Sequence, residues 1–178
     1  GVGLPEDAQL ETIIGQAQIG LAQNDEAGEH LRKAIRLDRT NTTAMIALAE
    51  LYGEQREMHR AMRLLQTLVD TDPNNARGRE MLFSAYLTDR DRRAAARQIE
   101  ELRRMSAPPT TIARCVAWLE FDRDHPDPAR FERTLQEAVD ASAPDAPTLH
   151  LIALAQMQQR RYADAVKTLE QAAALDPA

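Results

Sequence analysis

Few residues in this chain have the types and spacing that catalysis or metal binding requires. The four histidines are His30, His59, His125 and His150, and no two of them lie four residues apart. Histidine pairs at that helical spacing, or histidines combined with closely spaced cysteines, are what zinc sites use, so these residues predict no metal site. Cys115 is the only cysteine, which excludes an internal disulfide. We expect Cys115 to pack inside the protein as a small apolar group.

Other signatures of chemistry are also missing from the sequence. There is no glycine-rich phosphate-binding loop and no G-x-S-x-G motif for a nucleophilic serine. Acidic residues are abundant, but no spacing singles out a pair of carboxylates for acid–base work. We therefore predict no catalytic, cofactor-binding or metal-binding residues, no cofactor, and a protein that is not an enzyme.

Charge narrows the possible partners. The chain has 28 acidic and 22 basic residues and a net charge of −6, which argues against general affinity for nucleic acids or anionic membranes. No apolar run approaches about 18 residues, so we expect no direct membrane insertion.

A local group of arginines alternates with acidic residues and has no aromatic neighbours that could stack on bases. This indicates a solvated helix face; the group comprises Arg90, Arg92, Arg93, Arg97, Arg103 and Arg104.

The elements that must position any functional residue repeat along the chain. Near the end, a small residue, an apolar residue four positions later and a small residue three positions after that occur as Ala165, Leu169 and Ala172. Similar triplets lie earlier, about 34 residues apart: Ala27-Leu31-Ala34, Ala61-Leu65-Leu68 and Ala95-Ile99-Leu102. A fixed period of this size predicts a repeat array.

The segment before each triplet repeats as well. An apolar residue precedes a small one at Ile14-Gly15, Leu48-Ala49, Val116-Ala117 and Ile152-Ala153, and Tyr52 and Tyr86 stand at one further position. This pattern resembles the tetratricopeptide repeat (TPR) family. The resemblance implies an all-α, right-handed superhelix of five tandem helical hairpins, a single array over 8–178 with repeats 8–41, 42–75, 76–109, 110–145 and 146–178. Residues 1–7 are expected to be a lead-in or a remnant of cloning.

Local signals refine these elements. The first hairpin is expected to have helices over about 8–21 and 26–37, with Gly15 permitting their close approach. Asn41 and its neighbours predict an N-cap, and Thr110-Thr111 predict another. Phe83 and Phe131 replace small residues, so the third and fourth hairpins should be splayed or shifted in register.

The TPR resemblance implies that a concave groove, lined by the first helix of each repeat, binds the partner. Its apolar residues gather in the C-terminal half, and aromatic and methionine side chains are typical anchors for a helix or an extended peptide. The alternative is that Trp118 turns inward and belongs to the core. The residues predicted to bind the partner are Ile46, Glu50, Met81, Arg114, Trp118, Phe121, His150, Leu151, Leu154 and Met157.

One TPR activity is disfavoured. TPR domains that clamp the C-terminal tail of heat-shock chaperones use lysine, arginine and asparagine at set positions of consecutive repeats. The first frame here offers Thr12, Gln16, Ala47, Arg77 and Met81 at these positions. Neither this frame nor the later ones supplies the cationic clamp, so a chaperone tail is not expected as the partner.

These observations favour a non-enzymatic scaffold for protein–protein interaction that binds a peptide or protein. Two alternatives stay open: a structural spacer in a bacterial secretion or polymer-export assembly, and the regulatory arm of an enzyme whose catalytic domain is absent. The array stops at Pro177 without a capping helix, which predicts a piece of a longer array or self-association through the last hairpin. Arginine outnumbers lysine 20 to 2, which suggests a bacterial protein. Cytoplasm and periplasm are not distinguished.

Overall fold

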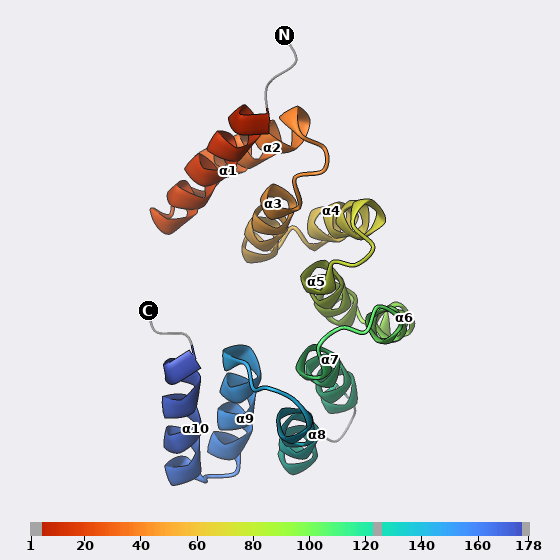
Figure 1. Ribbon diagram of the computed structural model, residues 1–178, viewed down its shortest axis with the longest axis vertical. Helices are drawn as coiled ribbons and strands as arrows, with labels where there is room; N and C mark the ends of the chain where they lie inside the picture. Colours follow the sequence, from red (N-terminus) through yellow and green to blue (C-terminus); the bar gives the residue numbers. More distant parts are fainter. Residues whose placement is uncertain (1–4, 123–125, 176–178) are drawn as a thin grey trace. The chain divides into compact units, whose positions relative to one another are not determined.

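The computed structural model describes residues 5–122 and 126–175. All regular structure in these residues is α-helical, in ten helices labelled in Figure 1. They are α1 (Pro5–Gly20), α2 (Asn24–Leu37), α3 (Thr42–Glu54), α4 (Met58–Thr71), α5 (Ala76–Thr88), α6 (Arg92–Arg104), α7 (Pro109–Phe121), α8 (Pro128–Ala141), α9 (Ala146–Gln158) and α10 (Tyr162–Leu175). Two helices fall in each predicted repeat, so the all-α class and the five successive helix pairs are confirmed.

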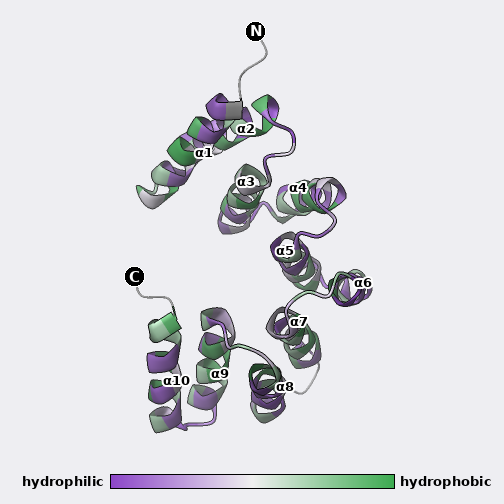
Figure 2. Ribbon diagram, in the orientation of Figure 1, coloured by the Kyte–Doolittle hydropathy of each residue, from purple (hydrophilic) through white to green (hydrophobic). Residues whose placement is uncertain are grey.

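The chain forms two compact units, residues 1–89 and 90–178. The N-terminal unit contains α1–α5 and the C-terminal unit contains α6–α10, so the boundary falls between the two helices of the third repeat. Within each unit, every helix packs against the next along the chain, and α1 also contacts α3 as α7 contacts α9. Figure 2 shows apolar and polar stretches alternating along the helices, as expected for helices that bury one face.

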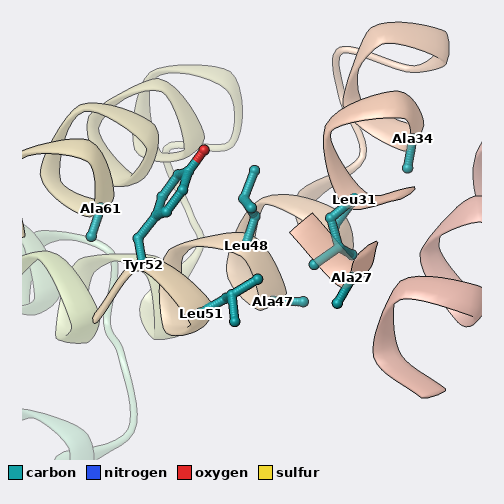
Figure 3. Close-up of a cluster of buried hydrophobic side chains, with 9 residues drawn as sticks. Ala27, Leu31, Ala34, Ala47, Leu48, Leu51, Tyr52 and Ala61 are labelled. Atoms are coloured by element: carbon teal, nitrogen blue, oxygen red, sulfur yellow. The ribbon is translucent and has the colours of Figure 1, made fainter. Parts of the chain in front are cut away.

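The core of the N-terminal unit is built from the repeated triplets. Ala27, Leu31 and Ala34 of α2 are fully buried and pack against Leu48 and neighbouring residues of α3 (Figure 3). The predicted close approach at Gly15 is confirmed, because a Cβ added there would lie 2.8 Å from Cγ of Leu31. Small residues at these positions therefore set the distance between paired helices.

The turn inside a hairpin has the same form in four of the five repeats. Ala22, Arg56, Arg90 and Arg160 occupy equivalent positions and all have a positive φ, near 60°. At three of them, the next residue donates its backbone N–H to a carbonyl five residues back, for example from Glu57 to Tyr52 at 2.8 Å. This is the Schellman geometry that ends a helix and reverses the chain, here without a glycine.

Of three local predictions about helix ends, one is confirmed and two need correction. The first helix begins at Pro5, three residues before the predicted Ala8, since proline suits the first turn of a helix. The N-cap at Asn41 is confirmed by a 2.9 Å bond from the Ala44 amide. The cap predicted at Thr110-Thr111 is wrong: α7 already begins at Pro109, and both threonines are buried inside the helix.

Of the two phenylalanines expected to splay their hairpins, only Phe131 belongs to a hairpin that lies within one unit. Phe131 is buried, and α7 and α8 pack along each other as α3 and α4 do, so the splaying expected of the fourth hairpin is not observed. Phe83 is also buried. Its predicted effect concerns helices of different units and stays a prediction.

Candidate partner-binding surface

The C-terminal unit aligns α7 and α9 through a buried arginine. Nη1 of Arg114 on α7 donates to Asp145 Oδ1 at 2.8 Å and to Thr148 Oγ1 at 2.8 Å, and Nη2 donates to Thr111 Oγ1 at 3.2 Å. Asp145 is also the N-cap of α9, where it accepts from the Thr148 amide at 2.8 Å. One charged cluster therefore starts α9 and fixes its position against α7.

The electrostatics of this cluster favour the ionised form of Asp145. Burial by itself raises the pKa of this carboxyl group, but hydrogen bonds from Thr110 and Thr148 and the charge of Arg114 outweigh burial, so the pKa lies below its ordinary value. The carboxylate is thus held charged beside the guanidinium.

This arrangement corrects one predicted site residue. Arg114 was expected to line the groove as a partner-binding residue, but only 9% of its surface is exposed and its guanidinium is engaged inside the unit. The reason is its neighbour Asp145, one repeat away in the chain, which sequence spacing alone did not connect to it. We therefore remove Arg114 from the proposed binding set.

Three aromatic rings meet where α7 ends and α8 begins. The Trp118 and Phe131 ring centroids are 5.0 Å apart, those of Phe121 and Phe131 are 5.3 Å apart, and all three pairs are edge-to-face. Phe131 is buried, whereas 39% of Trp118 remains exposed. Trp118 is therefore anchored by the core on one side and open to solvent on the other.

The next first helix, α9, contacts α7 and exposes apolar residues of its own. Leu154 lies at the repeat position equivalent to Trp118, and Met157 at that of Phe121; 54% of Leu154 and 45% of Met157 are exposed. Phe121 is half-buried against the core of the unit. We call the surface formed by Trp118, Phe121, Leu154 and Met157 the α7–α9 face.

The other two predicted residues of α9 flank this face. His150 is exposed, and Leu151 is half-buried against the core. Among the described residues, no three histidine, cysteine or acidic side chains gather closely enough to hold a metal ion. Cys115 is buried, as expected.

The predicted site residues of the N-terminal unit have a different character. Ile46 and Met81 are half-buried and pack against the core. Glu50 is exposed, and Arg77 donates to its carboxylate at 3.0 Å. The hollow beside them, between α3, α4 and α5, is lined by both of these charged groups together with Glu80. Apolar side chains such as Met58 and Met81 also line it, so this part of the predicted groove combines charged and apolar groups.

Helix α10 has an exposed apolar stripe that was not among the predicted site residues. Tyr162, Val166 and Leu169 on α10 are exposed, although Leu169 belongs to the repeated triplet. The equivalent residues of α4 are Met58, Met62 and Leu65, which pack in the core cluster that includes residues of α5. The signal that could have located the stripe is this repeat equivalence.

None of the described helices is long and apolar enough to cross a bilayer.

Comparison with known proteins agrees with this fold. Family models described as tetratricopeptide repeat match residues 19–82 and 148–178. No curated protein matches the sequence significantly.

Among solved structures, the chain is similar to a thermophilic TPR protein of Thermus thermophilus, with 16% identity, a TM-score of 0.71, and coverage of 96% of this chain and 92% of that one. It is similar to the MamA protein, with 16% identity, a TM-score of 0.62, and coverage of 97% and 93%. It is also similar to PilF of Pseudomonas aeruginosa, with 16% identity, a TM-score of 0.67, and coverage of 94% and 77%.

Identities this low support the fold alone. The family matches, the ten helices in five pairs and the repeated small and apolar positions agree with one another. On this evidence, the chain belongs to the tetratricopeptide repeat family.

Proposed function

We propose that this chain is a non-enzymatic scaffold that binds a protein or peptide partner through the α7–α9 face. TPR proteins generally serve as interaction modules, and the observation that carries the choice of face is the exposure of Trp118, Leu154 and Met157 on two adjacent first helices. A tryptophan held by neighbouring rings is already ordered, so its immobilisation on binding costs little entropy.

The chemistry of the face suggests what it would bind. Apolar and aromatic groups dominate, and Arg114, four residues before Trp118 on α7, is engaged with Asp145. The expected ligand is therefore the apolar side of a helix or an extended peptide with apolar side chains, in preference to a chaperone tail that presents a terminal carboxylate. Ile46, Glu50 and Met81 of the N-terminal unit stay predicted partner-binding residues.

A substitution at Leu154 tests the proposal. Peptides selected from a displayed random library against the full chain would be measured for affinity to wild type and to Leu154→Glu. Because Leu154 is exposed, the change should alter stability by less than about 0.5 kcal/mol. We expect it to weaken binding at least about tenfold, since it places a charge in an apolar contact.

Gln16→Glu is the matched control, because Gln16 is exposed and stands at the equivalent position in the first repeat. It should leave affinity unchanged. Selected peptides that bind Leu154→Glu as tightly as wild type, with both proteins folded by circular dichroism, would contradict the proposal.

The second candidate function is a spacer whose last hairpin packs against a neighbouring module. The exposed stripe of Tyr162, Val166 and Leu169 on α10 favours it, because equivalent residues of α4 are packed in a core cluster. In that case Val166→Glu would disrupt assembly, and Leu154→Glu would not.

A further inference from the structure

A hollow of about 380 Å³ lies on the N-terminal unit between α2 and α4. Its floor includes Leu48 and Tyr52 of α3, which are both buried, and Figure 3 shows their side chains standing between α4 and α2. Its walls include arginines from both flanking helices. This volume lies within the range of small-ligand and side-chain pockets.

The charge of the hollow is entirely positive. Arg32 and Arg36 of α2 and Arg60 and Arg63 of α4 line it, and no acidic residue does. The guanidinium groups of Arg32, Arg36 and Arg63 make no hydrogen bond or ion pair with the residues that the structure describes. The chain as a whole carries a net charge of −6, so this cluster contrasts with the rest of the protein.

Arg60 closes one side of the floor. Its guanidinium carbon lies 4.4 Å from the centre of the Tyr52 ring, and it also pairs with Glu57 at 2.6 Å. Tyr52 is the only aromatic residue that lines the hollow, and it is buried with Arg60 over its ring, which disfavours stacking of a nucleic-acid base there. The combination of an apolar floor and cationic walls suits a ligand that is both apolar and acidic.

We propose that this hollow binds a short acidic segment of a partner protein, with an apolar side chain seated on Leu48 and the partly buried Ile35 and Leu64. Carboxylates that flank this side chain would pair with Arg32, Arg36 and Arg63. Arginine's planar fork of donors matches a carboxylate in a bidentate manner. The site is formed by other helices than the α7–α9 face and does not depend on it.

The repeat itself offers an internal comparison. Between α8 and α10, the positions equivalent to the four arginines hold Gln136, Asp140, Asp164 and Lys167. Asp140 accepts from Gln136 at 2.8 Å, and Asp164 pairs with Arg161 at 2.9 Å. The hairpin architecture therefore does not require arginine at these positions, whereas two arginines four residues apart on α2 destabilise a helix by a few tenths of a kcal/mol.

The test is a fluorescence polarisation titration of the full chain with a labelled, end-capped peptide of sequence EEDFDEE. Wild type should bind it more tightly than EEDSDEE, which lacks the apolar group, and should not bind KKNFNKK. The double variant Arg36→Glu with Arg63→Glu should keep its fold, because both residues are exposed. It should weaken binding at least about tenfold, because it reverses two charges that pair with the peptide. Lys167→Glu, equivalent to Arg63 on α10, is the matched control and should bind as wild type does.

Four outcomes would overturn the proposal. They are no binding of EEDFDEE by wild type, equal binding of EEDSDEE, undiminished binding by the folded double variant, or equal loss in Lys167→Glu. Polyuridine and vesicles containing phosphatidylserine serve as competitors. If either binds more tightly than the peptide with the same dependence on Arg36 and Arg63, the site recognises that class of ligand and the assignment to an acidic peptide is wrong.

Discussion

The two units place different chemistry at the same repeat position. The ninth residue of the repeat is Gln16, Glu50 or Ser84 in the N-terminal unit, and all three are exposed. In the C-terminal unit the same position holds Trp118 and Leu154, also exposed. The shared fold therefore does not dictate the residue type at this position, which is polar in the N-terminal unit and apolar in the C-terminal unit.

The contrast extends to the arginines. In the C-terminal unit, Arg114 is buried and satisfied by Asp145 and Thr148, so its charge serves alignment of helices. In the N-terminal unit, Arg36 and Arg63 extend into a hollow without a carboxylate partner among the described residues. Arginine thus suggests different roles in the two units: the buried, paired arginine aligns helices, and the open cluster can attract an acidic ligand.

The largest expected effect comes from the aromatic core that supports the α7–α9 face. Phe131→Ala should lower the free energy of unfolding of the C-terminal unit by about 3–5 kcal/mol, because it removes a buried ring and leaves a cavity beneath Trp118. Urea unfolding followed by Trp118 emission measures this. A loss below about 1 kcal/mol would show that the cluster is not core.

The reverse change tests the N-terminal unit, where Ala61 is buried at the position equivalent to Phe131. Ala61→Phe should destabilise this unit by about 1–3 kcal/mol, since its core has no aromatic cluster to receive the ring. Hydrogen exchange resolved by peptide would assign the loss to residues 1–89.

Gly78→Ala should destabilise the N-terminal unit by about 1–3 kcal/mol. An added Cβ would lie 2.1 Å from Cδ2 of Leu68, which is fully buried, whereas the C-terminal unit accommodates Thr148 at the equivalent position. Gly53→Ala is the control, because nothing lies within 4 Å of its added Cβ, and it should be neutral or stabilising. Thermal unfolding of both variants measures the difference, and a change of the same sign in both would contradict the steric account.

Asp145→Asn should cost about 1–3 kcal/mol at neutral pH, since it removes the charge paired with Arg114 while leaving an N-cap acceptor. The lowered pKa of Asp145 means that its contribution is complete above the ordinary carboxyl pKa and is lost as pH falls through the folded-state value. The stability difference from wild type should therefore shrink in acid. Denaturant titrations at several pH values measure it, with Asp140→Asn as an exposed control; a difference independent of pH would exclude the charge as its source.

The smallest expected effect comes from Glu50, an exposed polar residue of the N-terminal unit. Glu50→Gln should change stability by less than about 0.5 kcal/mol, because its pair with Arg77 is exposed. It should also leave peptide affinity unchanged. A loss of affinity comparable to that of Leu154→Glu, measured by the same titration, would extend the binding surface into the N-terminal unit.

The sequence was sufficient for the fold because the repeated small and apolar positions, such as Ala27, Leu31 and Ala34, are the ones that control helix spacing. It was less informative about the site, because exposure depends on neighbours one repeat away. Arg114 has the spacing of a groove residue, but Asp145 draws it inward. Trp118 could not be assigned to core or surface from sequence, and the rings of Phe121 and Phe131 explain why it belongs partly to both.

The most direct test of the α7–α9 face uses Trp118, the only tryptophan in the chain, as its reporter. In the free protein its emission should be accessible to acrylamide, because 39% of the residue is exposed. Adding a library-selected peptide at saturating concentration should shift the emission to the blue and protect it from the quencher. A peptide that binds while emission and quenching stay unchanged would place the partner elsewhere and contradict the proposed function of this face.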